Sequence, residues 1–463
     1  MERLKRRTVI SLAASYASQL GTTGAEFLTK IVLAWLIMPT QWGIFAEAML
    51  IVLIADVFTD LGLSQHLVRE KSRPFGNVLL LRSILALGAI AVVEVFAPYL
   101  KFFTPQLIGP TRALAPLILI KAVGMVPTVY VDRELIVQKS LLPQFARLAL
   151  MAAVSIVLAV KGMGVWALVI GTLASELAYT VLIWVSVRKI IPLEFTLSHT
   201  RNLLRGSSYL FLIAIIGLLL QQGDILVTGS LLDPKTVGFY AMALMLVQRV
   251  SKVVETAIYR VIYPLFCEVS HDRHKLGQVY KCATLAIIAI EAPIYMFLLF
   301  HAGFVVSILP ARWLPMAFIL QALAMSGVVN PFTTFGIEVL RATKQDRMLF
   351  MASVSGAVAL VAGGFILTHQ FGPMGMVAAN YLPVGAIFVI IAMLRTIRTQ
   401  FLSLARQLAV VYVVSFTVSS AAFVFGGTGL TRHIAGILAV IVLWAFFYKK
   451  YGLTEGKETL GLL

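Results

Sequence analysis

The chain has 463 residues, of which 60% are hydrophobic and only 13% are charged. Average soluble domains carry about 25% charged residues, and a surface with far fewer charges aggregates. The composition therefore excludes a soluble enzyme, a disordered chain and a disulfide scaffold, and it predicts an all-α polytopic membrane protein. Continuous apolar runs such as 149–160 and 434–447 exclude a β-barrel, because barrel strands alternate apolar and polar residues.

Apolar runs of about 20 residues, the length that a helix needs to cross a bilayer core, predict about fourteen membrane-spanning helices. The expected limits are 8–38, 40–62, 77–100, 113–132, 143–160, 163–187, 206–230, 236–259, 280–302, 313–339, 348–369, 373–394, 404–424 and 432–448. The first run starts with basic residues, as a signal peptide does, but it is too long for one, so we expect a retained helix. Gly21 and Gly24 near its middle predict a kink.

The basic residues alternate between the two sides of the membrane. With the N-terminus inside, 27 of the 38 Lys and Arg residues fall on the inner side and 6 on the outer side. This asymmetry is a strong positive-inside signal and predicts that both termini are cytoplasmic. The net charge of +17 therefore reflects topology and contact with anionic membrane lipids, and it does not indicate binding of nucleic acid.

Three short patterns recur in the same order in the two halves of the chain. The pairs are Leu36-x-x-Pro39-x-x-x-Gly43-x-Phe45 with Leu231-x-x-Pro234-x-x-x-Gly238-x-Tyr240, Pro127-x6-Glu134 with Pro331-x6-Glu338, and Gly164-Val165-Trp166-Ala167 with Gly375-Met376-Val377-Ala378. The repeat unit is six helices. An even number gives both copies the same orientation, so we expect two lobes related by an axis along the membrane normal.

The domain organisation follows from this repeat. We expect a six-helix lobe over 1–188, a cytoplasmic linker over 189–205, a second six-helix lobe over 206–395, and two extra helices with a cytoplasmic tail over 396–463.

Nine ionisable side chains fall near the middle of the predicted spans. They are Glu26, Lys30, Lys121, Glu176, Asp224, Arg249, Lys252, Glu255 and Glu291. An ionised group at mid-bilayer costs roughly 2.5–3.5 kcal/mol, so most of them should face a partner or a wet cavity.

One helix carries a polar stripe. Gln248, Lys252, Glu255 and Tyr259 follow one another at i, i+4, i+7 and i+11, and Arg249 borders the stripe. Two cations three residues apart repel each other unless an anionic group lies nearby. We therefore expect a substrate cavity lined by Lys30, Lys121, Arg249, Lys252 and Tyr259.

Simpler interpretations compete with a cavity. Glu26 and Lys30 are four residues apart and are suited to a buried structural pair. Glu176 and Glu291, each alone at mid-span, are suited to protonated carboxyls hydrogen-bonded between helices. Charged residues nearer the span ends are expected to be solvated or snorkelling; they are Glu47, Asp56, Asp60, Arg82, Glu94, Arg260, Glu338 and Arg341.

No catalytic constellation is present in the sequence. It contains no Walker loop, no G-x-S-x-G and no H-E-x-x-H, so we expect no catalytic residues, no metal and no cofactor. Cys267-x3-His271-x2-His274 lacks a fourth zinc ligand and is interpreted as a solvated loop. Cys267 and Cys282 are interpreted as unpaired thiols.

The segment from Leu28 to Phe45, continuing to Asp60-Leu-Gly-Leu63, resembles the polysaccharide transporter family of oligosaccharide-lipid flippases. Arg133-Glu134-Leu135 and the following Gly164-Val165-Trp166-Ala167-Leu168 are similar to the same family. The resemblance places the chain in the multidrug/oligosaccharidyl-lipid/polysaccharide superfamily. It implies two lobes, alternating access and export of an undecaprenyl-diphosphate-linked oligosaccharide across a bacterial inner membrane. The last two predicted helices resemble the extra pair of lipid II flippases.

The resemblance implies a polyprenyl-diphosphate-linked oligosaccharide and membrane lipids as partners, with a polysaccharide polymerase and glycosyltransferases as protein partners. A diphosphate cavity should be cationic, but five of the nine central charges are acidic. These acids either carry a coupling proton or sodium ion or pair with the basic residues. The candidates are Glu26, Asp224, Glu255 and Glu291. Two other functions compete: a cation-coupled exporter of small amphipathic molecules, and a glycosyl-polymer ligase or polymerase. The outer loops are too short for the last of these.

Overall fold

A computed structural model describes residues 23–64, 75–102, 105–134, 138–188, 197–325, 330–382, 384–427 and 429–447, together with residues 21, 67, 136, 191, 449 and 450. Every regular element in these ranges is a helix, which confirms the all-α polytopic prediction. Ten helices in the described ranges are long and apolar enough to cross a membrane. The larger number of about fourteen stays a prediction.

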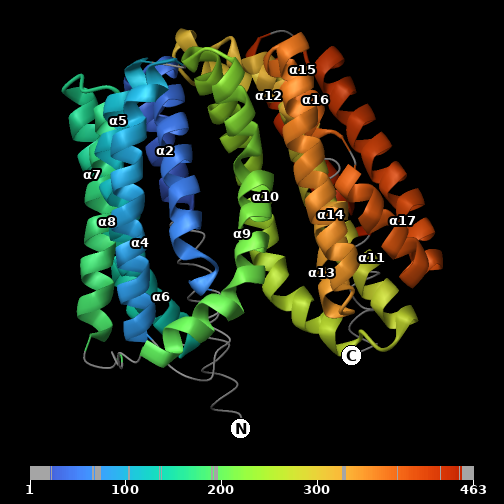
Figure 1. Ribbon diagram of the computed structural model, residues 1–463. Coiled ribbons are helices and arrows are strands. Elements are labelled where there is room, and N and C mark those ends of the chain that lie inside the picture. Colours follow the sequence, from blue (N-terminus) through green and yellow to red (C-terminus); the bar gives the residue numbers. More distant parts are fainter. Residues whose placement is uncertain are drawn as a thin grey trace. The chain divides into compact units, whose positions relative to one another are not determined.

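The chain divides into two compact units, 1–238 and 239–463. In the N-terminal unit, helical residues 23–36 precede a series of elements whose α-helices are labelled in Figure 1. These elements are α2 (Pro39–Asp60), α4 (Phe75–Phe96), the 3₁₀ turns η1 (Ala97–Phe102) and η2 (Pro105–Leu107), α5 (Ile108–Leu114), α6 (Pro116–Arg133), α7 (Gln138–Val160), α8 (Val165–Val187) and α9 (Leu197–Leu231). α2 packs against α9, α5 and α6, and α7 packs along α8.

Helix α10 (Pro234–Glu268) starts at the end of the N-terminal unit and continues into the C-terminal unit. The C-terminal unit then contains α11 (Arg273–Ser307), the 3₁₀ turn η3 (Ala311–Trp313), α12 (Met316–Ala324), α13 (Asn330–Ala342), α14 (Asp346–Val358), the π-helical turn η5 (Ala359–Gly363), α15 (Gly364–Phe371), α16 (Pro373–Asn380), α17 (Val384–Phe425) and α18 (Leu430–Phe447). α11 lies at its centre and packs against α12, α17 and α18.

Prolines start several of these helices. Pro39, Pro116 and Pro373 occupy the first turn of α2, α6 and α16, and Pro234 is the first residue of α10. A proline at this position loses nothing, because the first N–H groups of a helix have no intrahelical acceptor, and its fixed φ suits a helix.

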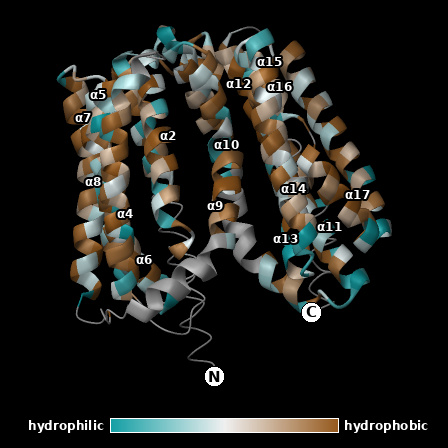
Figure 2. Ribbon diagram, in the orientation of Figure 1, coloured by the Kyte–Doolittle hydropathy of each residue, from teal (hydrophilic) through white to brown (hydrophobic). Residues whose placement is uncertain are grey.

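Apolar side chains fill the inside of each unit and also cover its lipid-facing surface. In the C-terminal unit a buried cluster joins α10, α11, α13, α14, α17 and α18, and includes Phe266, Phe335 and Phe401. On α18, apolar side chains such as Ile437, Ile441 and Val442 are exposed. Figure 2 shows that the middle parts of the helices are mostly hydrophobic and that hydrophilic residues lie toward the helix ends. Such surfaces are suited to lipid, which offers exposed apolar groups an apolar solvent.

Several helices differ from the predicted spans. Predicted span 373–394 is divided between α16 and the first part of α17. Within α17 two helices meet at a kink at Ile397 (φ −139°, ψ 44°), inside the break expected before span 404–424. Predicted span 313–339 is divided between α12 and α13. α9 and α10 each have 35 residues, about 52 Å at 1.5 Å per residue, and so exceed a bilayer core. α9 begins inside the predicted linker 189–205, which is therefore helical from Leu197 onward.

The first recurring pattern places its two copies in direct contact. A Cβ added to Gly43 would overlap the carbonyl oxygen of Pro234, and a Cβ added to Gly238 would overlap the carbonyl oxygen of Pro39. Each copy therefore presents its glycine to the proline of the other, and the two helix starts approach backbone to backbone. The contact is reciprocal, as expected for two related segments.

The third pattern has a different register from the one predicted. Gly164 comes before α8 with φ +58° and ψ −123°, and Gly372 comes before α16 with φ +59° and ψ −143°. Both glycines hold a positive φ, which other residues rarely adopt. The structural counterpart of Gly164 is therefore Gly372, and the predicted match to Gly375 is wrong by three residues.

Candidate functional site

Four charged side chains from α2, α4 and α6 form one network in the N-terminal unit. The guanidinium of Arg82 donates a hydrogen bond to Asp56 at 2.8 Å and lies 3.0 Å from a carboxylate oxygen of Asp60. The ammonium of Lys121 lies 3.6 Å from the other carboxylate oxygen of Asp56. Two positive and two negative charges thus balance one another.

This network is largely removed from solvent. The side chain of Arg82 is 5% exposed, and those of Asp56 and Asp60 are 19% and 15% exposed. The expectation that these three residues snorkel is therefore wrong. The acids are four residues apart on one face of α2, so a cation on the neighbouring helix satisfies both of them in place of water. Lys121, a predicted cavity residue, is 24% exposed beside this network.

A second ion pair joins α7 and α8. Arg147 donates to Glu176 at 3.1 Å, and its guanidinium lies 5.4 Å from the centre of the Tyr179 ring. The Tyr179 hydroxyl lies 3.1 Å from the Thr128 hydroxyl on α6. Glu176 is therefore paired, and its interpretation as a carboxyl alone at mid-span is wrong. Its partner, Arg147, lies at the foot of the predicted span 143–160 and was therefore counted with the basic residues of the inner side.

The other predicted site residues of the N-terminal unit lie on different helices. Asp224 on α9 is buried, and the Thr228 hydroxyl donates to its backbone carbonyl at 2.7 Å. Glu26 and Lys30 are half-buried on helical residues 23–36. Lys121 contacts Asp56 of the charged network. The roles assigned to Lys121, Asp224, Glu26 and Lys30 stay predictions.

In the C-terminal unit the predicted site residues lie on α10 and α11. Arg249 is half-buried and Lys252 is exposed on α10, while the side chains of Glu255 and Tyr259 lie outside the described residues. Glu291 on α11 is 1% exposed and acts electrostatically on Tyr412 of α17. A cavity shared by the cations of both units stays a prediction.

Sequence reasoning missed two buried groups. The side chain of Glu47 on α2 was expected to be solvated or snorkelling near the outer interface, but it is buried, with 5% of its surface exposed. His301 on α11 and His433 on α18 place their Nδ1 atoms 2.9 Å apart, at a point where His301 departs from helical geometry. Neither group has a sequence signal, because each depends on a distant segment. Among the residues that the structure describes, no group of three or more His, Cys, Asp or Glu side chains could hold a metal ion.

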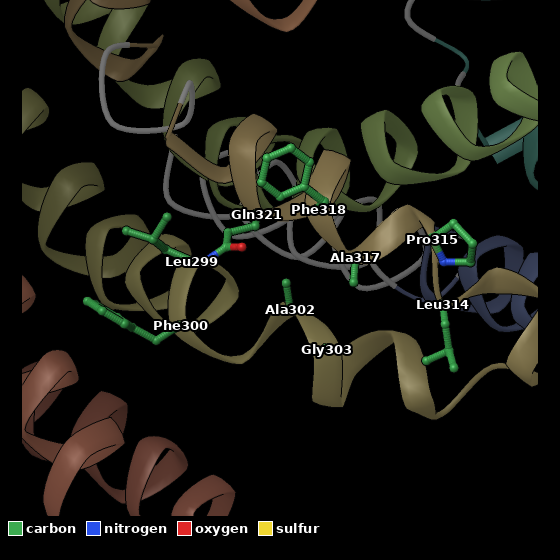
Figure 3. A pocket seen from close by; sticks show the side chains of 9 residues that line it. All are labelled: Leu299, Phe300, Ala302, Gly303, Leu314, Pro315, Ala317, Phe318 and Gln321. Carbon is green, nitrogen blue, oxygen red and sulfur yellow. The ribbon is translucent and has the colours of Figure 1, made fainter. Parts of the chain in front are cut away.

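A pocket lies between α11 and the start of α12 (Figure 3). It is lined by Leu299, Phe300, Ala302, Gly303, Leu314, Pro315, Ala317, Phe318 and Gln321. Apolar side chains dominate this lining, and Gln321 is its one polar side chain. No predicted site residue contributes to it.

Comparison with known proteins gives a consistent result. The family model described as "Polysaccharide biosynthesis protein" matches residues 32–318. The succinoglycan biosynthesis transport protein ExoT of Rhizobium meliloti is 25% identical over 74% of this chain and 71% of its own length. The lipopolysaccharide biosynthesis protein WzxC of Escherichia coli is 24% identical over 71% of this chain and 68% of its own length.

Solved structures share the fold at low sequence identity. The lipid II flippase MurJ in an inward closed conformation matches 94% of this chain and 98% of its own, with a TM-score of 0.76 and 15% identity. An inward-facing multidrug resistance transporter of the MATE family matches 82% of this chain and 96% of its own, with a TM-score of 0.62 and 16% identity.

Proposed function

Since the chain belongs to the polysaccharide biosynthesis protein family, we propose that it moves a lipid-linked oligosaccharide across the bacterial inner membrane during assembly of a surface polysaccharide or exopolysaccharide. The substrate is an undecaprenyl-diphosphate-linked oligosaccharide, which passes from the inner to the outer leaflet by alternating access. The protein is a transporter and not an enzyme, in line with the relative named as a succinoglycan transport protein.

The observation that carries this proposal is the family match, which extends from residue 32, in the helix before α2, to residue 318 in α12 and so includes the N-terminal unit from residue 32 onward. The fold shared with a lipid II flippase supports it, because the same architecture serves another lipid-linked saccharide. A polysaccharide polymerase and glycosyltransferases complete the proposed set of partners.

The cations supply the proposed recognition of the diphosphate. Hydrogen bonds between Lys or Arg and phosphate are charge-assisted and stronger than neutral ones. Arg249 and Lys252 lie three residues apart on α10, so they can contact the same anionic group. Lys30, Lys121 and Tyr259 remain the other proposed contacts, and Glu26, Asp224, Glu255 and Glu291 remain the proposed carriers of a coupling proton or sodium ion.

Neutral replacement of both α10 cations tests this role. We expect an Arg249→Gln/Lys252→Gln variant to abolish polysaccharide export in cells that lack their own transporter, because the substrate loses two phosphate contacts. Immunoblots of membranes should show normal protein levels. The control is Lys235→Gln, at an exposed position at the start of α10, which should export normally. Full export by the double variant would contradict the proposed site.

The orientation can be tested with two exposed lysines, Lys161 and Lys275. In a background with Cys267 and Cys282 replaced by serine, a membrane-impermeant thiol reagent added outside should label Lys161→Cys and leave Lys275→Cys unlabelled. This result follows from the charge asymmetry, which places Lys161 outside and Lys275 in the cytoplasm. The reverse labelling pattern would invert the topology.

The MATE-like fold supports a second candidate, a cation-coupled exporter of small amphipathic molecules. Transport assays on purified protein in vesicles separate the two functions. Movement of a fluorescent polyprenyl-diphosphate oligosaccharide supports the first, and movement of a cationic dye without the lipid substrate supports the second.

A further inference from the structure

The carboxyl of Glu47 lies where α2 packs against α9, and it is not among the residues proposed to bind substrate or a coupling ion. The side chain of Glu47 is 5% exposed, and its Oε1 atom has no hydrogen-bond partner among the described residues. The side chain packs against Gly229 of α9, where an added Cβ would lie 2.9 Å from Glu47 Cγ. The two helices therefore enclose this carboxyl tightly.

A negative charge follows directly after α9. Asp233 accepts hydrogen bonds from the backbone N–H groups of Lys235 and Thr236 at 2.9 and 3.1 Å, and from the Thr236 hydroxyl at 2.6 Å. Partial burial acts to raise the pKa of Asp233, but these hydrogen bonds outweigh it and hold the pKa below its ordinary value. Asp233 is therefore ionised at neutral pH and repels a negative charge on Glu47.

Three cations on helices packed against α2 are engaged with other acids. Arg82 and Lys121 contact Asp56, and Arg112 of α5 pairs with Glu94 of α4 at 3.1 Å. The other ionisable side chains described on the elements packed against α2 are Tyr130, Asp132 and Arg133 of α6, Glu176 and Tyr179 of α8, and Tyr209 and Asp224 of α9; Lys235 follows in the first turn of α10. A carboxylate at Glu47 would thus be buried and opposed by Asp233, so the neutral acid is the stable form in this arrangement.

We propose that Glu47 is a proton-binding site that controls the separation of α2 from α9. Its carboxyl carries a proton while the helix ends near Pro39 and Leu231 lie together. Loss of the proton to water leaves a carboxylate that needs hydration, and hydration requires the helices to part. In the orientation proposed above, this end of both helices faces the outer side, so the proton comes from that side. The link to transport rests on the proposed function, whereas the proton site itself does not.

Infrared spectroscopy of the full-length protein in lipid tests the protonation state. At neutral pH the wild-type protein should show a carboxylic-acid C=O band that loses intensity in Glu47→Gln. Glu94→Gln is the matched control, because Glu94 is 45% exposed and ion-paired, and it should leave the band unchanged. If Glu47→Gln also leaves the band unchanged, Glu47 is ionised and the proposal is wrong.

A distance measurement tests the coupling to the helices. Spin labels are placed at Thr40→Cys on α2 and Leu231→Cys on α9, with both native cysteines replaced by serine. The distance between the labels should increase over the same pH range in which the infrared band of the protonated carboxyl disappears. Glu47→Gln resembles the protonated acid and should keep the short distance at every pH. If the distance between the two labels in the otherwise wild-type protein does not change with pH, the proposal is wrong. Because neither readout needs substrate, both can succeed even if export of a lipid-linked oligosaccharide fails.

Discussion

Replacing either Gly43 or Gly238 by alanine should prevent the protein from accumulating in a folded form. The new methyl group would overlap a backbone carbonyl oxygen of Pro234 or of Pro39, and a helix backbone cannot rotate aside as a side chain can. The cost should exceed the roughly 1–3 kcal/mol of an ordinary overpacked core. Fluorescence-detected size-exclusion chromatography after heating measures the loss of folded protein in detergent.

Gly88→Ala is the matched control, because Gly88 lies on α4 with nothing within 4 Å of an added Cβ. It should be neutral, or stabilise the helix by about 0.5–1 kcal/mol. Since Gly43 and Gly238 belong to one contact, the double alanine variant should cost less than the sum of the two single variants. If Gly43→Ala melts at the same temperature as Gly88→Ala, the close approach of the two backbones is wrong.

Arg82→Met should destabilise the protein by about 3–5 kcal/mol, because it leaves Asp56 and Asp60 without their shared cation inside the membrane. The double variant Arg82→Met/Asp60→Asn should recover most of that loss. It restores charge balance, since Asp56 keeps its contact with Lys121 at 3.6 Å. Thermal unfolding midpoints of purified protein in one detergent provide the comparison.

Arg112→Met controls for the removal of an arginine as such. Arg112 and Glu94 are 44% and 45% exposed, and pairs of this kind contribute about 0–1 kcal/mol. Equal unfolding midpoints for Arg82→Met and Arg112→Met would show that the buried network does not stabilise the unit. A double variant no more stable than Arg82→Met would show that charge balance is not the cause.

Much of the helix pattern could be predicted from the sequence, because apolar length and proline position are local properties. Pro39 and Pro116 start α2 and α6, and their fit to the first turn of a helix is a signal that the sequence carries. The helix ends on the predicted cytoplasmic side could not be predicted in the same way. α9 and α10 continue beyond their apolar segments, and hydropathy carries no signal for a helix that leaves the membrane.

The partners of charged residues were the least predictable part of the candidate site. The depth of Asp56 and Arg82 was inferred from their distance to the ends of the predicted spans, but that distance does not say which neighbouring helix they face. The pairing of Arg82 with Asp56, and of Arg147 with Glu176, depends on contacts between helices. One local signal was available, since two acids four residues apart on a membrane helix indicate a shared cation.

The reciprocal contact between the two copies of the Pro–Gly pattern has an evolutionary consequence. If both copies descend from one shorter ancestor, that ancestor could have made the same contact across a symmetric dimer, where a single patch serves both sides. A single glycine codon would then have encoded the glycine at both symmetry-related contacts of the dimer, and one mutation would have disrupted both contacts. After duplication the requirement would fall on two codons, those of Gly43 and Gly238, and each glycine would serve a contact with the other half of the chain.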